Sequence, residues 1–300
     1  MGTVPVPDPK LLVRDAASAA MRRIFAASPD RSDSGAVAPD VDDDAGLFGP
    51  DSVTWRVHSD LSMLVGGVRA LFVQTVHPLA IAGVAQHSQY RSDPLGRLRR
   101  TAAFVAATTY GSTAKADAAI ARVRSIHERV RGLAADGRPY SANDPELLAW
   151  VHHVEVESFL LAYQRVGPGL GSVDADTYVL EMAGLGRRLG VPDPVTTTAD
   201  LHAWVRNHPE QRVTSEARSA VRFIVGAPLP LSARAPYAVL IAAAISLVPM
   251  RQRLALGLLL PGPISGRLAS EPAARAMLGV LGWSLGPSPA LQQAHARVGA

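Results

Sequence analysis

Hydrophobic residues recur along most of the chain at spacings of three and four, which is the period of an amphipathic helix. No stretch keeps the strict alternation of a half-buried strand, and no repeat of fixed length occurs. The pattern therefore predicts an all-α protein with one multi-helix domain. The helices that we expect cover residues 61–76, 79–87, 94–110, 114–131, 145–164, 175–189, 198–207, 216–224, 237–248, 251–259 and 271–283.

Capping residues support several of these boundaries. Asp93–Pro94 and Asp144–Pro145 each place a side-chain acceptor before a proline, which is typical of the first turn of a helix. Glycine follows the apolar pattern at Gly111, Gly132 and Gly190, where we expect helices to end.

The two ends of the chain differ from its middle. A short amphipathic segment, Leu11–Phe25, is followed by Ser28–Asp44, which is rich in Ser, Asp, Ala and Pro and closes on the acidic run Asp40–Asp44. We therefore expect residues 1–45 to be a mobile leader. The helical domain should cover 46–286, and 287–300 should form a flexible tail. We find no signal peptide. The longest apolar stretch, Tyr237–Val248, is shorter than the ~20 residues of a membrane span. We therefore expect a cytoplasmic protein, with peripheral contact to a membrane left open.

Composition narrows the class of protein. With 48% hydrophobic and 19% charged residues among 300, the chain can bury a sizeable core and is not a disordered protein. The absence of cysteine excludes disulfides, thiolate metal sites and cysteine nucleophiles. The net charge is +4, but the basic residues are scattered among acids and aromatic residues make up only 5%, so we expect no nucleic-acid partner.

Several common catalytic motifs are missing from the sequence. There is no phosphate-binding GxxxxGK[ST] loop and no G-x-S-x-G elbow. The stretch His127–Arg131 begins like the zinc-protease HExxH motif but ends in arginine, so the second ligand is absent. The Glu-x-x-His pair of helical di-iron sites does not occur. These absences disfavour a metal hydrolase and a di-iron bundle.

His127 is the residue that stands out most. On an ideal helix Ile120, Val123, His127 and Val130 share one face, so the imidazole points with the apolar stripe. One interpretation is an axial ligand to a buried haem, because a neutral imidazole donates a lone pair to iron. The other is a core histidine that is hydrogen-bonded to a carbonyl group. Spacing alone leaves both open.

The helix expected at 94–110 carries a second unusual face, on which two guanidinium groups and a hydroxyl lie beside a phenyl ring. Such a face suits a pocket for a carboxylated or oxygen-bearing ligand, because a guanidinium grips a carboxylate with two hydrogen bonds. It also suits a solvated face with salt bridges. The residues are Arg97, Arg100, Thr101, Phe104 and Thr108.

Further histidines have two interpretations each. Two of them bracket the helix at 79–87 and fit either a pocket wall or a helix cap, namely His77 and His87. In the helix at 145–164, two His–Glu pairs each share a face and fit either a proton relay or a buried structural network. They are His152 with Glu155 and His153 with Glu157.

A set of short motifs occurs in one order along residues 46–265. They are Gly46–Trp55, Gln74–Pro78, His87–Ser88, Arg91–Pro94, Arg97–Thr101, Ile126–His127, Tyr140–Pro145 and Trp150–His152. Together they resemble the DUF2236 family, also called the MpaB-type or rubber-oxygenase catalytic-domain family.

The resemblance implies an all-helical fold with a globin-like core. It also implies a b-type haem, since latex-clearing members hold one and use dioxygen to cleave the carbon–carbon double bonds of polyisoprene. The axial ligand of those enzymes corresponds to His127, and the arginine and threonine of their Arg-x-x-[basic]-Thr helix correspond to Arg97 and Thr101.

The sequence departs from the latex-clearing enzymes at two points. They carry a lysine in the Arg-x-x-[basic]-Thr motif that can occupy the distal iron position, whereas Arg100 stands here and has no usable lone pair. They also use a glutamate as a distal base, and no glutamate occurs between Val53 and Arg124. His87 could supply a base instead. We do not expect rubber cleavage itself.

The sequence thus predicts a haem-b-dependent oxygenase that acts with dioxygen on a small apolar or isoprenoid-like substrate. One alternative is a non-catalytic helical protein that binds haem or an apolar ligand. Another is a structural protein without a cofactor, in which the histidines only satisfy hydrogen bonds in the core. We expect His127 to bind the iron, and the cofactor pocket to be completed by Arg97, Arg100, Thr101 and Phe104. The candidate catalytic residues are His87, Arg100 and Thr101. The oligomeric state stays open.

Overall fold

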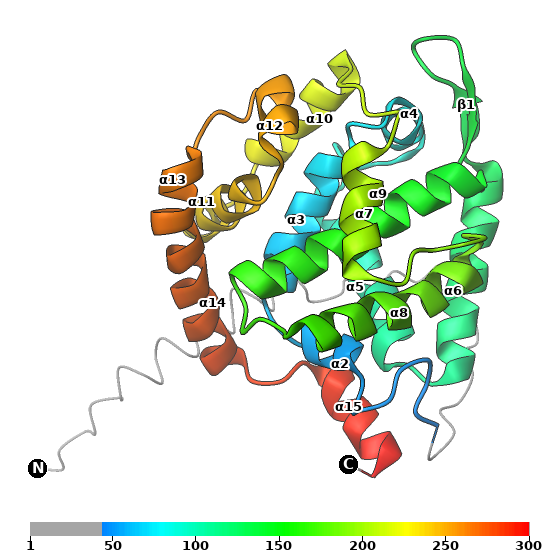
Figure 1. Cartoon of the computed structure of the whole chain (residues 1–300), viewed down its shortest axis with the longest axis vertical. Coiled ribbons are helices and arrows are strands. Elements are labelled where there is room, and N and C mark those ends of the chain that lie inside the picture. The colour runs from blue at the N-terminus through cyan, green and yellow to red at the C-terminus, as the bar shows by residue number, and fades with distance from the viewer. Residues whose placement is uncertain (1–43, 300) are drawn as a thin grey trace, which may run out of the picture.

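A computed structural model describes residues 44–299, whose regular structure is almost entirely helical (Figure 1). The all-α prediction is confirmed. The expectation of a globin-like core stays a prediction. The larger helices are α2 (Val53–His58), α3 (Met63–Gln74), α4 (Pro78–His87), α5 (Pro94–Tyr110), α6 (Thr113–Arg129), α7 (Pro145–Arg165), α8 (Ser172–Leu189), α9 (Thr198–Asn207), α10 (Ser215–Val225), α11 (Leu231–Ser246), α12 (Met250–Leu256), α14 (Glu271–Leu285) and α15 (Pro289–Val298).

Helix α7 crosses the middle of the molecule and organises the core (Figure 1). It packs along α3 and also contacts α2, α4, α8 and α9. Trp150, Val154 and Leu160 are fully enclosed, and Phe72 of α3 is enclosed with them. A helix that is apolar on most of its circumference belongs inside a domain, which explains why α7 has neighbours on nearly every side.

A buried ion pair joins the two central helices. Arg69 of α3 donates from Nη2 to Glu157 Oε2 at 2.7 Å and from Nη1 to Ser158 Oγ at 2.6 Å. Its Nε donates to the carbonyl oxygen of Leu247 at 2.9 Å, and His202 Nδ1 lies 2.9 Å from Glu157 Oε1. The charges are thus matched by hydrogen bonds, which is the condition for burying them. The Arg69 guanidinium and these hydrogen bonds hold the pKa of Glu157 below its ordinary value, although burial alone would raise it.

The predicted caps form as expected. Asp93 Oδ1 accepts from the backbone N–H of Gly96 at 2.8 Å and starts α5, and Asp144 Oδ1 accepts from that of Glu146 at 2.9 Å and starts α7. Proline occupies the first helical position in both cases, where no N–H is needed. Gly190 ends α8 with a φ of +107°, a value that favours glycine.

A short β-hairpin follows α6, where we expected helix as far as residue 131. Strand β1 (Arg131–Leu133) pairs antiparallel with β2 (Pro139–Ser141). Between them lies Asp136–Gly137, with Gly137 at a φ of +82°. Asp-Gly is a strong hairpin signal, and it overrides the apolar period that favoured a longer helix.

The C-terminal third also differs in detail from the expectation. Helix α11 begins at Leu231, earlier than predicted, because Pro236 falls in its second turn and hid that start from the periodicity. Where we expect a flexible tail from residue 287, the structure has α15. Arg297 anchors this helix by donating to the carbonyl oxygens of Asp44 and Tyr110. The short α13 (Pro263–Ser265) and the π-helix η1 (Gly266–Ser270) were not predicted.

The two remaining expectations concern the N-terminal leader and contact with a membrane. Most of the predicted leader, 1–43, lies outside the described residues. Within 44–299, no single helix is long and apolar enough to cross a membrane. Only α3 and α4 taken together have the length and composition, and they are bent by 107° at their junction.

Candidate functional site

The candidate site lies where the α5–α6 hairpin leaves the rest of the core. Helix α5 packs on α6, α2 and α15, and α6 packs on α5 and α8, but neither packs closely along α3 or α7. The buried residues of the hairpin lie near its connection, at Thr108–Tyr110, Ala116 and Ile120. The opposite end, which carries Arg97 and His127, is only partly buried. The hairpin is therefore anchored at one end and loosely packed at the other.

His127 lies in the last turns of α6 and is half-buried. Its Nδ1 atom is enclosed and has no hydrogen-bond partner among the described residues. Burial lowers the pKa of the imidazole, which favours its neutral form. The core-histidine interpretation requires a carbonyl acceptor for the ring, and none of the described residues supplies one.

Arg97 lies in the first turn of α5 and reaches back toward the end of α4. Its Nη1 donates to Ser88 Oγ at 2.5 Å, and burial lowers the pKa of the guanidinium. No carboxylate pairs with it among the described residues. A half-buried cation without a counter-ion can bind a carboxylate group of a ligand.

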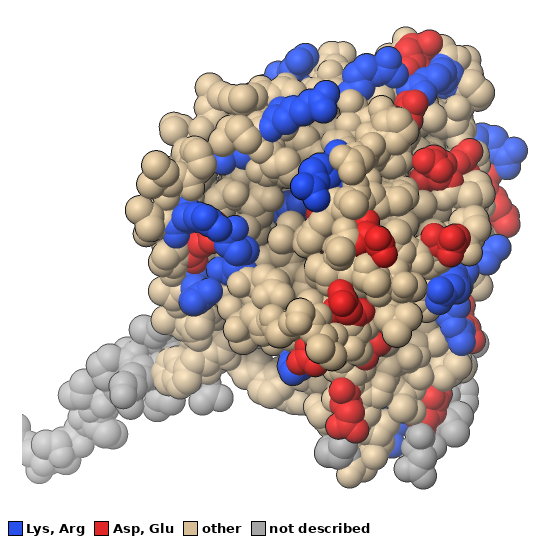
Figure 2. Space-filling view, viewed as in Figure 1, with Lys and Arg blue, Asp and Glu red and all other residues tan. Residues whose placement is uncertain are grey.

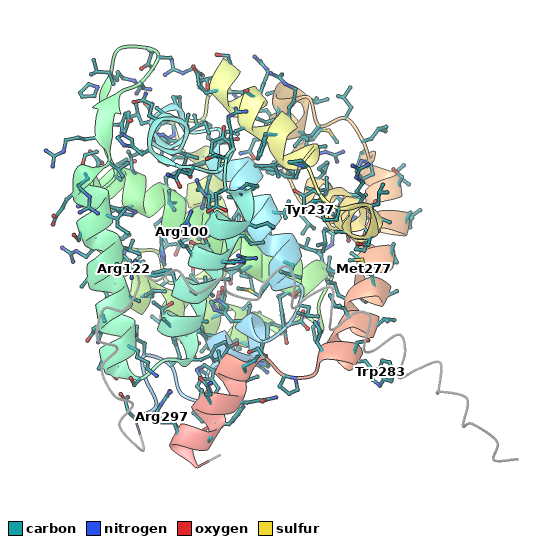
Figure 3. All side chains as sticks on the ribbon, turned by 180° about the vertical axis from the view of Figure 1, so that it is seen from behind. Arg100, Arg122, Tyr237, Met277, Trp283 and Arg297 are labelled. Atoms are coloured by element: carbon teal, nitrogen blue, oxygen red, sulfur yellow. The ribbon has the colours of Figure 1, made fainter. Side chains whose placement is uncertain are left out.

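The expected common face of α5 splits in the structure. Phe104 packs against the core and Thr108 is buried, as a pocket-lining stripe would be. Thr101 is exposed, and Arg100 is exposed and forms a surface ion pair with Asp93 at 3.3 Å. Figure 3, seen from behind, shows Arg100 on α5 beside Arg122 of α6. Arg100 and Thr101 are thus at the outer side of the hairpin and not in the interior.

His87 ends α4 close to the exit of α6. Its Nε2 lies 3.2 Å from the carbonyl oxygen of Arg131, and its ring stands edge-on to Tyr140 with centroids 6.2 Å apart. The structure therefore brings the ends of three helices together: His87 at the end of α4 with Ser88 after it, Arg97 near the start of α5, and the turn after His127. His77, by contrast, caps α4 at its other end, where its Nδ1 accepts from Ala80.

One stripe of side chains on α7 is only partly buried. Leu148, Val151 and Glu155 share a face at helical spacing. Leu148 and Glu155 are half-buried and Val151 is 37% exposed, although the opposite face of the same helix is closed. On α3, a side chain added at Gly67 would meet open space. Each of the two central helices thus has a partly open position on its surface.

Glu155 is the unusual residue on this stripe. Burial raises the pKa of its carboxyl group to about 7, and neither a cation nor a hydrogen-bond donor accompanies it among the described residues. The side chain keeps partial exposure, so a bound molecule can reach it. Sequence reasoning weighed Glu155 only together with His152. The signal for a separate role was its helical spacing from Leu148 and Val151.

A chain of hydroxyl and imidazole groups adjoins Glu155. His58 of α2 joins Thr109 Oγ1 at 2.8 Å through Nδ1 and the Tyr178 hydroxyl at 3.0 Å through Nε2. Burial lowers the pKa of His58 to about 3. Burial, followed by the charges of Glu155 and Glu181, raises the pKa of Tyr178. Glu155 is therefore close enough to Tyr178 for their charges to interact.

These residues can be compared with what a haem requires. A haem iron needs one axial side chain, and it needs no cluster of ligands. The described residues hold no group of three or more metal-ligating side chains, which is compatible with that requirement. His127 offers a neutral, half-buried imidazole, and Arg97 offers an unpaired cation for a propionate. The residues at the loosely packed end of the hairpin therefore fit the group.

One family model matches this chain. A family model described as "ER-bound oxygenase mpaB/B'/Rubber oxygenase, catalytic domain" matches residues 55–298, which is most of the chain. The chain belongs to this oxygenase family. The match runs through α15, so it includes both central helices, the hairpin and the C-terminal helices. No curated protein and no solved structure gives a significant match.

Membership sets the class of reaction for this oxygenase domain. The family is an oxygenase catalytic domain, so the chain is expected to act on a substrate together with dioxygen. The resemblance seen in the short motifs is confirmed by a match that begins at Trp55 and continues to residue 298. The cofactor, its ligand and the substrate go beyond what family membership establishes.

Proposed function

We propose that this oxygenase domain binds a b-type haem between the loosely packed end of the α5–α6 hairpin and the central pair α3–α7. His127 would bind the haem iron. The observation that carries the proposal is the coincidence of three features: an enclosed imidazole nitrogen without a partner, an unpaired half-buried arginine, and an unsealed stripe on the central helix. When bound, the haem would supply dioxygen binding and activation.

The protein's own residues have separate tasks in this proposal. Arg97 would hold a propionate, with Ser88 fixing the guanidinium. Phe104, Leu148 and Val151 would exclude water and favour an apolar or isoprenoid-like substrate. Arg100 and Thr101 lie on the surface and would act only at the mouth of the site. His87, exposed beside Tyr140, is retained as an alternative base.

Glu155 would hold and move the proton that the reaction needs. A carboxyl group with a pKa of about 7 exists in both forms at neutral pH, which suits general acid–base work. The glutamate that latex-clearing relatives use as a base has no counterpart before Arg124 in the sequence, and Glu155 would fill that role from a different helix. The neighbouring Tyr178–His58–Thr109 chain would keep the surroundings of the carboxyl group fixed.

The proposal is tested by oxygen uptake of the haem-loaded protein with an unsaturated isoprenoid. We expect His127→Ala to lose both the haem absorption band and oxygen uptake. We expect Glu155→Gln to keep the band and lose oxygen uptake by about 10²-fold or more. The matched control is Glu210→Gln, a surface carboxylate paired with Arg138, which should change neither. A band without substrate-dependent uptake in the wild type would instead support the non-catalytic haem-binding alternative.

A further inference from the structure

The C-terminal third presents an exposed apolar surface, which we call the leucine face. It consists of five aliphatic side chains within the segment 254–268, each between 59% and 79% exposed: Leu254, Leu259, Leu260, Ile264 and Leu268. The segment comprises the end of α12, the loop after it, α13 and η1, along one edge of the molecule (Figure 1). Isolated exposed leucines are ordinary, but five in one short segment are not.

The same edge extends beyond the leucine face. Trp283 of α14 is 59% exposed and projects away from the body of the molecule in Figure 3. A cleft of about 800 Å³ opens next to Leu260 and is lined mainly by apolar side chains, among them Val225, Leu229 and Ile241. The apolar character is therefore continuous from the cleft onto the surface.

The charged residues in the C-terminal part of the chain are almost all basic. Residues 226–300 contain six arginines and one acidic residue, Glu271, so their formal charge is 6 − 1 = +5. Glu271 is buried and bound to Arg165 at 2.7 Å. The exposed arginines beside the leucine face, Arg251 and Arg267, have no carboxylate partner among the described residues. This part of the molecule lies on the left in Figure 2, where the surface is tan and blue apart from one red group surrounded by blue. Red side chains are spread over the right side.

Apolar side chains flanked by unpaired arginines match the surface of an anionic bilayer. The aliphatic groups enter the boundary between headgroups and acyl chains, and the guanidinium groups bind the phosphates. A second copy of this chain matches less well, because a twofold interface would bring the arginines of both copies together without an acid to neutralise them. We propose that the leucine face docks the oxygenase onto an anionic membrane surface without spanning it.

The experiment is co-sedimentation of the full chain with vesicles of phosphatidylcholine mixed with phosphatidylglycerol, compared with phosphatidylcholine alone. We expect the wild type to bind the anionic vesicles and to be released by salt. The double variant Leu259→Glu and Leu260→Glu should bind at least about tenfold less, because two inserted side chains are lost. The double variant Arg251→Gln and Arg267→Gln should lose most of the preference for anionic vesicles.

Matched controls separate docking from folding and from catalysis. Leu180→Glu changes a leucine of α8 that is 54% exposed and should leave vesicle binding unchanged. All changed side chains are exposed, so thermal melting should stay the same. Overturning results are no binding by the full chain, binding that survives in the leucine variant, and a wild-type dimer that the leucine variant converts to monomer. Vesicle binding needs no haem, so it fails or succeeds independently of the proposed function.

Discussion

At the scale of single residues, the molecule places charged groups in two opposite situations. Arg69 and Glu157 are buried together with their hydrogen-bond partners complete, as a structural network requires. Glu155, on the same helix as Glu157, has no partner among the described residues, and burial raises its pKa. A fold gains nothing in stability from such a carboxyl group, so its presence is better explained by a functional role.

We predict that Glu155→Gln stabilises the protein at alkaline pH. The folded state raises the pKa of Glu155 from 4.5 to about 7, so it disfavours the carboxylate. That penalty is absent below pH 4.5, grows between pH 4.5 and 7, and is complete above pH 7. The variant should gain up to ~3 kcal/mol at pH 8, less where water reaches the group, and almost nothing at pH 4.5. Urea unfolding at both pH values measures the difference, and an equal effect at both would contradict the assignment.

The opposite result is expected for the buried pair. Arg69→Ala leaves Glu157 as a buried charge with only His202 beside it and should cost about 3–5 kcal/mol of unfolding free energy. The matched control is Arg100→Ala, which removes an exposed ion pair with Asp93 and should cost less than about 1 kcal/mol. Comparable losses in urea unfolding for the two variants would show that Arg69 is not part of a tightly packed network.

At the scale of elements, local signals predicted the helices well where the cap and the apolar period coincide. The boundaries of α5 and α9 were predicted correctly, and the Asp93 cap forms. The β-hairpin and the early start of α11 were missed because Asp136–Gly137 and Pro236 are turn and helix-breaking residues inside an apolar pattern. For the site, the sequence could predict the face of α6 that carries His127. It could not predict that Arg100 and Thr101 turn outward, because this depends on how α5 packs in three dimensions.

The cap of α5 can be tested directly. Asp93→Ala removes the acceptor for the Gly96 N–H and should destabilise the protein by about 1 kcal/mol, because the first turn of α5 loses its side-chain cap. Asp93→Asn keeps a capping oxygen but removes the ion pair with Arg100, so it should cost only a few tenths of a kcal/mol. Thermal melting ranks the three proteins. If Asn were as harmful as Ala, the ion pair and not the cap would be the stabilising contact.

At the scale of the whole molecule, buried histidines connect several helices. Burial lowers the pKa values of His58 and His152 to about 3 and those of His77 and His153 to about 4. The rings of His77, His208 and Trp204 surround Trp150, with ring centroids 5.6, 4.7 and 6.2 Å from that of the indole. The interior thus depends on imidazoles that stay neutral.

We predict that the protein loses stability as the pH falls from 6.5 to 4. In the unfolded chain these histidines take up protons near pH 6.5, whereas in the folded state they do so only near pH 3–4. The contribution of these neutral histidines to the free energy of unfolding is therefore fully present above pH 6.5 and decreases below it. Glu155 acts in the opposite direction, but four histidines outweigh one carboxyl group. The melting temperature should be clearly lower at pH 5 than at pH 7, and an unchanged value would refute this picture of the core.

Haem binding at His127 is measured by an absorbance titration of the haem-free protein with haem. We expect a saturable, one-to-one binding curve with a sharp Soret band for the wild type. His127→Ala should lose that band while its melting temperature stays close to that of the wild type, and His87→Ala should retain it. A His127→Ala variant that binds haem with the wild-type spectrum would show that His127 does not bind the iron.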